Sequence, residues 1–135
     1  MVEDLSMLVT SKRGRFRFQQ VAHEFDYASG RTDLVGRDGE DRLHAFETKL
    51  IKWKEALDQA RRNACFAHFC YVALPFRSAQ SALRAKSEFR RHGVGLVLMT
   101  GLDAKLAIRP RKQAPLLPWL TKMALAFFPT NERVA

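Results

Sequence analysis

Two short runs of residues joined by a tight polar turn constrain this sequence more than any other feature. Residues 30–36 and 43–50 each have the length of a strand, and the turn between them, residues 37–42, contains Asp38-Gly39. Asp-Gly between two apolar runs is typical of a β-hairpin, because both residues tolerate the backbone that a tight turn needs. The two runs therefore predict a pair of antiparallel strands.

Alternation along the second run indicates which of its side chains share a face. Successive side chains of a strand point to opposite faces, so Glu47 and Lys49 share one face while Phe46 and Thr48 share the other. If the first run pairs beside the second, Asp33 can lie next to Glu47. Two carboxylates and one ammonium group would then converge at one place, where they could hold a divalent metal ion and position a water molecule.

Further along the chain, the period of the apolar residues changes from two to 3.6, which predicts a helix over residues 53–64. The continuously apolar residues 69–74 and 95–99 are typical of strands buried on both faces. A helix ending at about His92, before Gly93, is expected between them. The remaining expected elements are a helix over residues 2–10, strands within residues 15–27 with a break near Gln19-Gln20, an edge strand over 105–108 and a helix over 119–128.

This order of elements predicts an α/β fold, in which a mixed sheet has helices on both of its faces. At 135 residues the chain is expected to form a single domain over residues 1–135. No apolar run approaches the roughly 20 residues of a membrane span, so we expect no membrane partner. Cys65 and Cys70 are expected to be buried, reduced thiols, and with the acidic residues 1–4, which do not resemble a signal peptide, they predict a cytoplasmic protein.

The charge of the chain points to a polyanionic partner. Lys and Arg together number 23 against 14 acidic residues, a formal net charge of +9. Nucleic acid is the polyanion that we expect. The sequence has no helix-turn-helix, zinc-finger or RNA-binding signature, so the contact should depend on phosphates rather than on base sequence.

The residues described above resemble the PD-(D/E)XK nuclease superfamily. The resemblance is carried by Asp33, by Glu47-Thr48-Lys49, by a following helix with Gln59, and by a buried strand that ends in Pro75. Together with Glu24, the local sequence around these motifs is similar to compact MmcB-like DNA-repair nucleases over residues 21–109. The resemblance implies a restriction-endonuclease-like fold and metal-dependent hydrolysis of phosphodiester bonds in DNA, in repair or processing. Thr32 departs from the superfamily pattern, which often has Pro before its first acidic residue.

Roles for individual residues follow from the resemblance and from the chemistry of hard cations, which prefer oxygen ligands. Asp33, Glu47 and Lys49 are expected to be catalytic, and a Mg²⁺ or Mn²⁺ ion is expected to bind the two carboxylates and the Thr48 carbonyl oxygen. Glu24 is expected to extend this acidic cluster. The residues expected to contact the substrate are Arg31, Lys52, Gln59 and Arg62.

Other interpretations of the same residues stay open. Asp33 could cap a turn, and Glu47 and Lys49 could form a solvated charge pair. Glu24 could be a surface residue, and none of the four histidines is expected to bind a metal. The whole domain could be a noncatalytic nucleic-acid-binding or interaction module on the same fold. The C-terminal helix, residues 119–128, could form a homodimer contact or cover the sheet.

Overall fold

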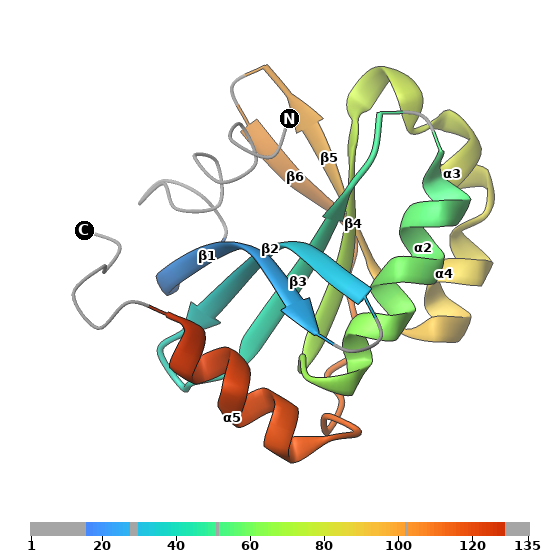
Figure 1. Ribbon diagram of the computed structural model, residues 1–135. Helices are drawn as coiled ribbons and strands as arrows, with labels where there is room; N and C mark the ends of the chain where they lie inside the picture. The colour runs from blue at the N-terminus through green and yellow to red at the C-terminus, as the bar shows by residue number, and fades with distance from the viewer. Residues whose placement is uncertain (1–15, 28–29, 51, 102, 129–135) are drawn as a thin grey trace.

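The computed structural model describes residues 16–27, 30–50, 52–101 and 103–128. Six strands form one sheet, and their order along the chain is also their order across the sheet (Figure 1). The strands are β1 (Phe18–Tyr27), β2 (Gly30–Asp38), β3 (Leu43–Thr48), β4 (Phe69–Pro75), β5 (Gly95–Thr100) and β6 (Asp103–Ile108). The helices are α2 (Trp53–Arg62), α3 (Gln80–Arg84), α4 (Lys86–His92) and α5 (Pro118–Phe127), with 3₁₀ turns η1 (Asn63–Cys65) and η2 (Phe76–Ser78).

The sheet is mixed, as the order of elements predicts. β3 pairs with β4, and β4 with β5, in parallel, whereas the other neighbouring strands are antiparallel. The parallel pairs are connected through α2 and through α3 and α4, which are the crossover helices that parallel pairing requires. This mixed sheet flanked by four described helices is an α/β fold, compatible with a restriction-endonuclease-like arrangement.

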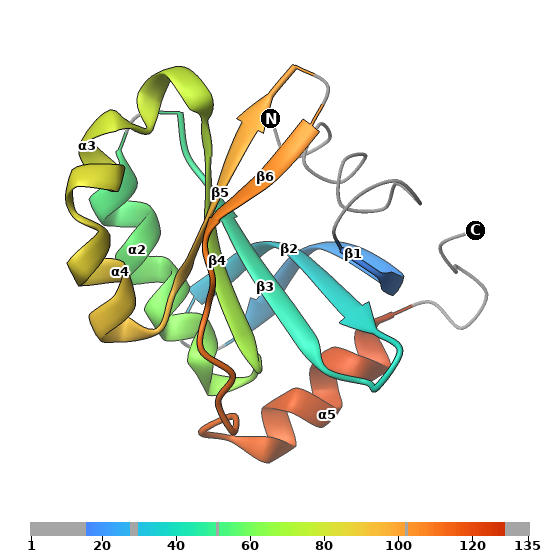
Figure 2. The ribbon, with the colours of Figure 1, turned by 180° about the vertical axis from the view of Figure 1, so that it is seen from behind.

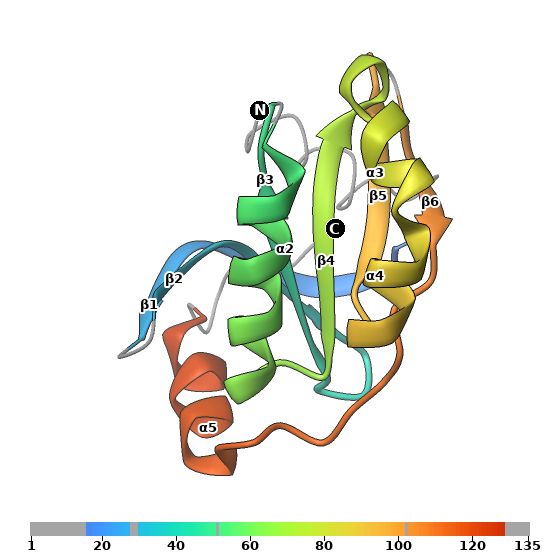
Figure 3. The same ribbon diagram turned by 90° about the vertical axis from the view of Figure 1, so that its right-hand side faces the viewer.

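One face of the sheet packs against the helices. Buried residues of α2, α3, α4 and α5 all belong to a single core cluster, which we call the helix-side cluster and which includes Phe25, Leu43, Phe66 and Phe89. Figures 1 and 3 show α2, α3 and α4 on the same side of the sheet. α5 packs against β1 and η1.

The other face carries a second core cluster, the strand-side cluster, which includes Phe18, Leu34, Phe46, Tyr71 and Val97. Among the described residues no helix contributes a buried side chain to it, and Figure 2 shows β3–β6 from this side. All four described helices therefore pack on the same face of the sheet, whereas the order of elements predicts helices on both faces. The helix expected over residues 2–10 lies outside the described part of the chain.

β1 contains two irregularities, and the sequence predicts one of them. The register shifts between Phe18 and Gln20, so the expected break near Gln19-Gln20 is confirmed as a bulge within one strand. Farther along, Ala22 and Phe25 both pack in the helix-side cluster although strict alternation would separate them. Glu24 lies between them with a φ of 54°, in the left-handed region, and this conformation shifts the alternation. Val21 therefore packs against the strand-side cluster and Phe25 in the helix-side cluster, although strict alternation would place both on one face.

Two smaller expectations also need correction. The helix expected to end at about His92 is interrupted at Ala85, which separates α3 from α4, although its end before Gly93 is confirmed. Gly93 has a φ of 68° and closes α4 in a left-handed cap. Cys65 is only partly buried, whereas Cys70 is buried as expected, and neither forms a disulfide.

Candidate functional site

The register between β2 and β3 brings the two predicted carboxylates together. Leu34 pairs with Phe46 and Val35 with Ala45, so continuing the same antiparallel register places Asp33 across from Glu47. Residues directly opposite each other in a sheet point to the same face. Leu43 and Ala45 pack in the helix-side cluster, so the face that carries Glu47 is the one that α2 covers.

A surface cavity of about 330 Å³ lies between β2, the end of β3 and α2. The three residues predicted to be catalytic, Asp33, Glu47 and Lys49, all line it. α2 contributes three polar side chains to the lining. The described residues that line the cavity are Arg31, Asp33, Glu47, Lys49, Glu55, Gln59 and Arg62. The structure therefore collects in one cavity residues that are far apart in the sequence.

Hydrogen bonds from Thr48 hold Asp33 in place. The Thr48 backbone N–H donates to Asp33 Oδ2 at 3.0 Å, and the Thr48 hydroxyl donates to the same oxygen at 3.2 Å. This carboxylate therefore bridges β2 and β3 rather than capping a turn. Thr48 contacts Asp33 through its donors, and the expected role of its carbonyl oxygen as a metal ligand stays a prediction.

Glu47 is buried to an unusual degree for a carboxylate. Only 3% of its surface is exposed, and β3 pairs there with β4, with Glu47 next to Val72. Burial and the nearby charge of Asp33 raise the pKa of Glu47 to about 8, although Lys49 acts in the opposite direction. Glu47 Oε2 is buried and has no hydrogen-bond partner. A buried, unpartnered carboxylate oxygen is costly, so it commonly marks a place where a missing ligand belongs.

A polar network behind the cavity, which sequence reasoning missed, is centred on Asn63. This residue is fully buried, and its Oδ1 accepts hydrogen bonds from the Tyr27 hydroxyl at 2.5 Å and the Thr32 hydroxyl at 2.9 Å. Asn63 Nδ2 has no well-formed hydrogen bond, yet it lies near enough to Glu47 to lower that residue's pKa. Its only sequence signal is an Asn directly after an amphipathic helix, which is too common to identify it.

Gln59 fastens α2 to the start of β2. Its Nε2 donates to the Arg31 backbone carbonyl at 3.1 Å, and its Oε1 accepts from Arg62 Nη1 at 3.0 Å. Gly30 permits this approach, because a Cβ atom there would lie 2.7 Å from Gln59 Nε2. Both ends of the Gln59 amide are therefore used within the protein, and Gln59 positions Arg31 and Arg62 at the cavity.

Besides Thr48, two predicted site residues lie outside the cavity lining. Glu24 is exposed on β1, where it is across from Asp33 because its neighbours His23 and Phe25 pair with Leu34 and Thr32. Its left-handed backbone accompanies the shift in alternation described above. Lys52 is exposed just before α2 and forms an ion pair with Glu55, with 3.9 Å between Nζ and Oε1.

The residues present fit a hard divalent cation. Among the described residues, no group of three or more His, Cys, Asp or Glu side chains could hold a metal ion. The site therefore offers two carboxylate ligands, those of Asp33 and Glu47. Mg²⁺ commonly binds through one or two carboxylates and completes its shell with waters and substrate phosphates. The unpartnered Glu47 Oε2 can serve as a metal ligand, and a cation bound there would offset the burial and the Asp33 charge that raise the pKa of Glu47.

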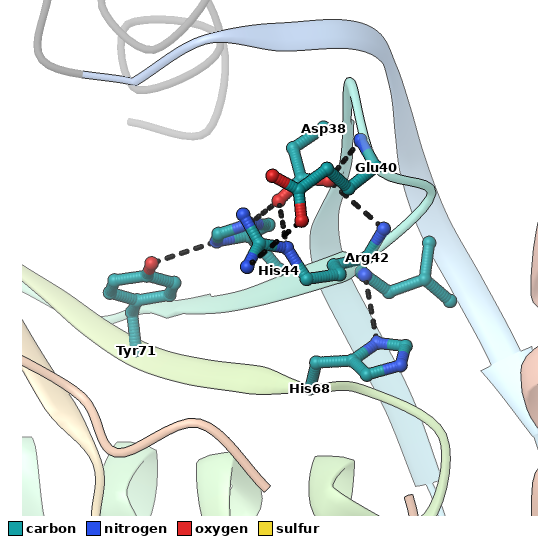
Figure 4. Close-up of polar contacts among 7 residues, drawn as sticks. Asp38, Glu40, Arg42, His44, His68 and Tyr71 are labelled. Carbon is teal, nitrogen blue, oxygen red and sulfur yellow. Dashed lines mark hydrogen bonds and ion pairs between the residues drawn. The ribbon is translucent and has the colours of Figure 1, made fainter. Parts of the chain in front are cut away.

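A second polar cluster lies at the opposite end of β2 and β3 (Figure 4). The Asp38 carboxylate accepts hydrogen bonds from the backbone N–H groups of Glu40 and Arg42 and from Arg42 Nε, all within 3.0 Å. His44 Nε2 lies 2.9 Å from Asp38 Oδ2, and His44 Nδ1 lies 2.8 Å from the Tyr71 hydroxyl. The cluster thus connects the β2–β3 turn to β4.

Protonation in this second cluster is fixed by its surroundings. Although burial acts against it, hydrogen bonds from His44 and Arg42 lower the pKa of Asp38 to about 2, so it is ionised at neutral pH. Burial lowers the pKa of His44, which is therefore neutral and donates to Asp38 through Nε2. Nδ1 then accepts a hydrogen bond from the Tyr71 hydroxyl. Both ring nitrogens of His44 are therefore used within the protein.

Comparisons with known proteins bear on the fold. No protein-family model matches this sequence, and no curated protein matches it. A solved structure, the SPO1766 protein of unknown function from Silicibacter pomeroyi, is similar with a TM-score of 0.62 and 18% sequence identity. The similarity covers 80% of this chain and 70% of that one. At this identity it supports the α/β fold and carries no information on activity.

The Asp38 cluster predicts how stability responds to pH. Because the folded pKa of Asp38 is lowered from 3.8 to about 2, its ionised form stabilises the fold above pH 4, and this contribution is lost as the pH falls through about 2. The Asp38→Asn variant should lose about 2 kcal/mol of unfolding free energy at pH 7. Urea unfolding of both proteins between pH 7 and pH 2 measures the difference, which should shrink towards the acidic end.

Glu40→Gln is the matched control, because Glu40 lies in the same turn but is exposed. Its unfolding free energy should stay within about 0.5 kcal/mol of the wild-type value at pH 7. Equal stability of Asp38→Asn and wild type at pH 7 would contradict the structural role given to this cluster.

Proposed function

We propose that this protein is a metal-dependent nuclease that hydrolyses phosphodiester bonds in DNA. The observation that supports the proposal most is the pairing of Asp33 with the buried Glu47, whose Oε2 has no partner, in one cavity with Lys49. A solvated charge pair would not leave a carboxylate oxygen buried and without a hydrogen-bond partner. The net charge of +9 supports a polyanionic substrate.

In this proposal each residue has a distinct task. Asp33 and Glu47 hold a Mg²⁺ or Mn²⁺ ion, which when bound supplies Lewis acidity and activates water for attack on phosphorus. Lys49 extends from the end of β3, where its backbone N–H donates to the Ala73 carbonyl at 3.3 Å. Its ammonium group orients the attacking water or stabilises negative charge on the phosphoryl oxygens. Arg62 contacts flanking phosphates, as does Arg31, which also pairs with Asp26.

Cleavage of labelled DNA in Mg²⁺ or Mn²⁺ tests the proposal. Asp33→Asn, Glu47→Gln and Lys49→Ala should each reduce the rate about 100-fold or more, because each removes a group that stabilises the transition state. All three variants should still bind DNA in a salt-dependent manner. In a thermal melt, Mn²⁺ should stabilise wild type and leave Asp33→Asn unchanged.

Glu24→Gln is the control for this series. Glu24 is acidic and lies opposite Asp33 but does not line the cavity, so this variant should cleave at a rate near wild type. Cleavage that survives all three site substitutions would contradict the proposal. DNA binding without cleavage by wild type would instead favour the noncatalytic binding module.

We also propose that the protein forms a homodimer through α5. Trp119, Met123 and Phe127 recur every four residues on this helix, and their surfaces are 56%, 54% and 48% exposed. Such a stripe at helical spacing is typical of a contact surface. No described helix is long and apolar enough to cross a membrane.

Sedimentation measures this association. Wild type should sediment as a dimer at micromolar concentration, and Met123→Glu should sediment as a monomer because it places a charge in the centre of the stripe. A matched change on an exposed polar site of the same helix, Lys122→Glu, should leave the dimer intact. A monomeric wild type would contradict the dimer and leave the nuclease proposal standing.

A further inference from the structure

Apart from α5 and Leu116 just before it, which is 72% exposed, the most exposed large apolar side chains of the described residues lie near the candidate site. Leu50 is 63% exposed and Phe76 is 60% exposed. Leu50 follows Lys49 directly, and Phe76 follows the last residue of β4. Single exposed apolar residues are common on protein surfaces, so exposure alone does not indicate a binding role. The position of these two residues relative to the site is what bears on such a role.

The topology places both residues at the same edge of the sheet as Lys49. β3 and β4 are parallel, and Thr48 pairs with Ala73, so the two strands end side by side. Figures 1 and 3 show that β3, β4 and β5 end at one edge, above the N-terminal end of α2. Phe76 lies three residues beyond Ala73, which corresponds to about 10 Å of extended chain. A strand of nucleic acid bound at Lys49 could therefore reach Phe76.

The backbone holds Phe76 in a fixed position although its ring is exposed. Pro75, with φ of −59° and ψ of 142°, directs the chain out of β4. The Phe76 carbonyl then accepts a hydrogen bond from the N–H of Ala79 at 3.2 Å, and Ala79 is buried. No aromatic ring in the described part of the chain packs against Phe76. The ring is thus presented to solvent on a rigid turn.

Positive charge accompanies this exposed ring. Arg77 is the next residue and is exposed, and no acidic side chain of the described residues pairs with it. Lys49 likewise has no ion-pair partner within the described ranges. An aromatic ring between unpaired cations is the combination with which proteins bind single strands, since the ring stacks on a base and the cations contact phosphates.

We propose that Phe76 is a stacking platform for an unpaired nucleobase, so that the substrate is single-stranded DNA or an unpaired segment of a duplex. This inference rests on the proposed nuclease function and names its substrate class. In a continuous duplex each base is stacked between its neighbours, and no base face is free to meet the Phe76 ring. Stacking on Phe76 therefore favours single strands over duplex.

Fluorescence anisotropy with a labelled single strand and its blunt duplex, in EDTA so that no cleavage occurs, tests the inference. Phe76→Ala should weaken single-strand binding about tenfold and change duplex binding less than about twofold. Phe76→Trp should keep single-strand affinity because it retains a ring, whereas Phe76→Leu should lose it although it remains apolar. A 2-aminopurine base in the strand should be quenched by wild type and not by Phe76→Ala.

The outcomes separate this inference from the nuclease proposal. Equal loss of single-strand and duplex affinity in Phe76→Ala, or no loss of either, overturns the stacking role. If the stacking role is overturned but wild type cleaves DNA and Asp33→Asn does not, the nuclease proposal still stands. A wild type that neither binds nor cleaves DNA overturns both. Melting temperatures of the Phe76 variants within a few degrees of wild type establish that each variant is folded.

Discussion

The antiparallel register of β2 and β3 places Asp33 across from Glu47, and every chemical property of the site depends on this pairing. Parallel pairing with β4 then buries Glu47, while Thr48 fixes the Asp33 carboxylate. Burial, and then the charge of the nearby Asp33 carboxylate, raise the pKa of Glu47 to about 8. The sheet therefore maintains an arrangement that is unfavourable without a compensating positive charge.

Two polar clusters hold this register from opposite ends. A shift of one residue between β2 and β3 would turn every side chain of β3 to the other face, so the register must be strongly specified. Asp38 and His44 connect the turn end of the hairpin to Tyr71 on β4. At the cavity end, Asn63 binds Tyr27 of β1 and Thr32 of β2, which fastens both strands to η1 at the end of α2.

The hairpin, the amphipathic helix and the buried strands follow from local patterns, so the sequence predicts the mixed sheet and the meeting of Asp33, Glu47 and Lys49. It predicts less where a contact is not local. The left-handed Glu24 shifts the alternation of β1 in a way that no composition signal indicates. Asn63 becomes important only because Tyr27 and Thr32 are folded onto it. The exposure of Phe76 likewise depends on the path of the chain after Pro75.

The most direct measurement of the central claim is anomalous diffraction from crystals soaked in Mn²⁺, recorded near the manganese absorption edge. If the β2–β3 register forms a cation site, one strong anomalous peak should lie within about 2.2 Å of an oxygen of Asp33 and of an oxygen of Glu47, because small hard cations form short bonds with carboxylates. Crystals of Glu47→Gln should lose that peak. A manganese peak elsewhere, or none in wild type at saturating Mn²⁺, would contradict the claim.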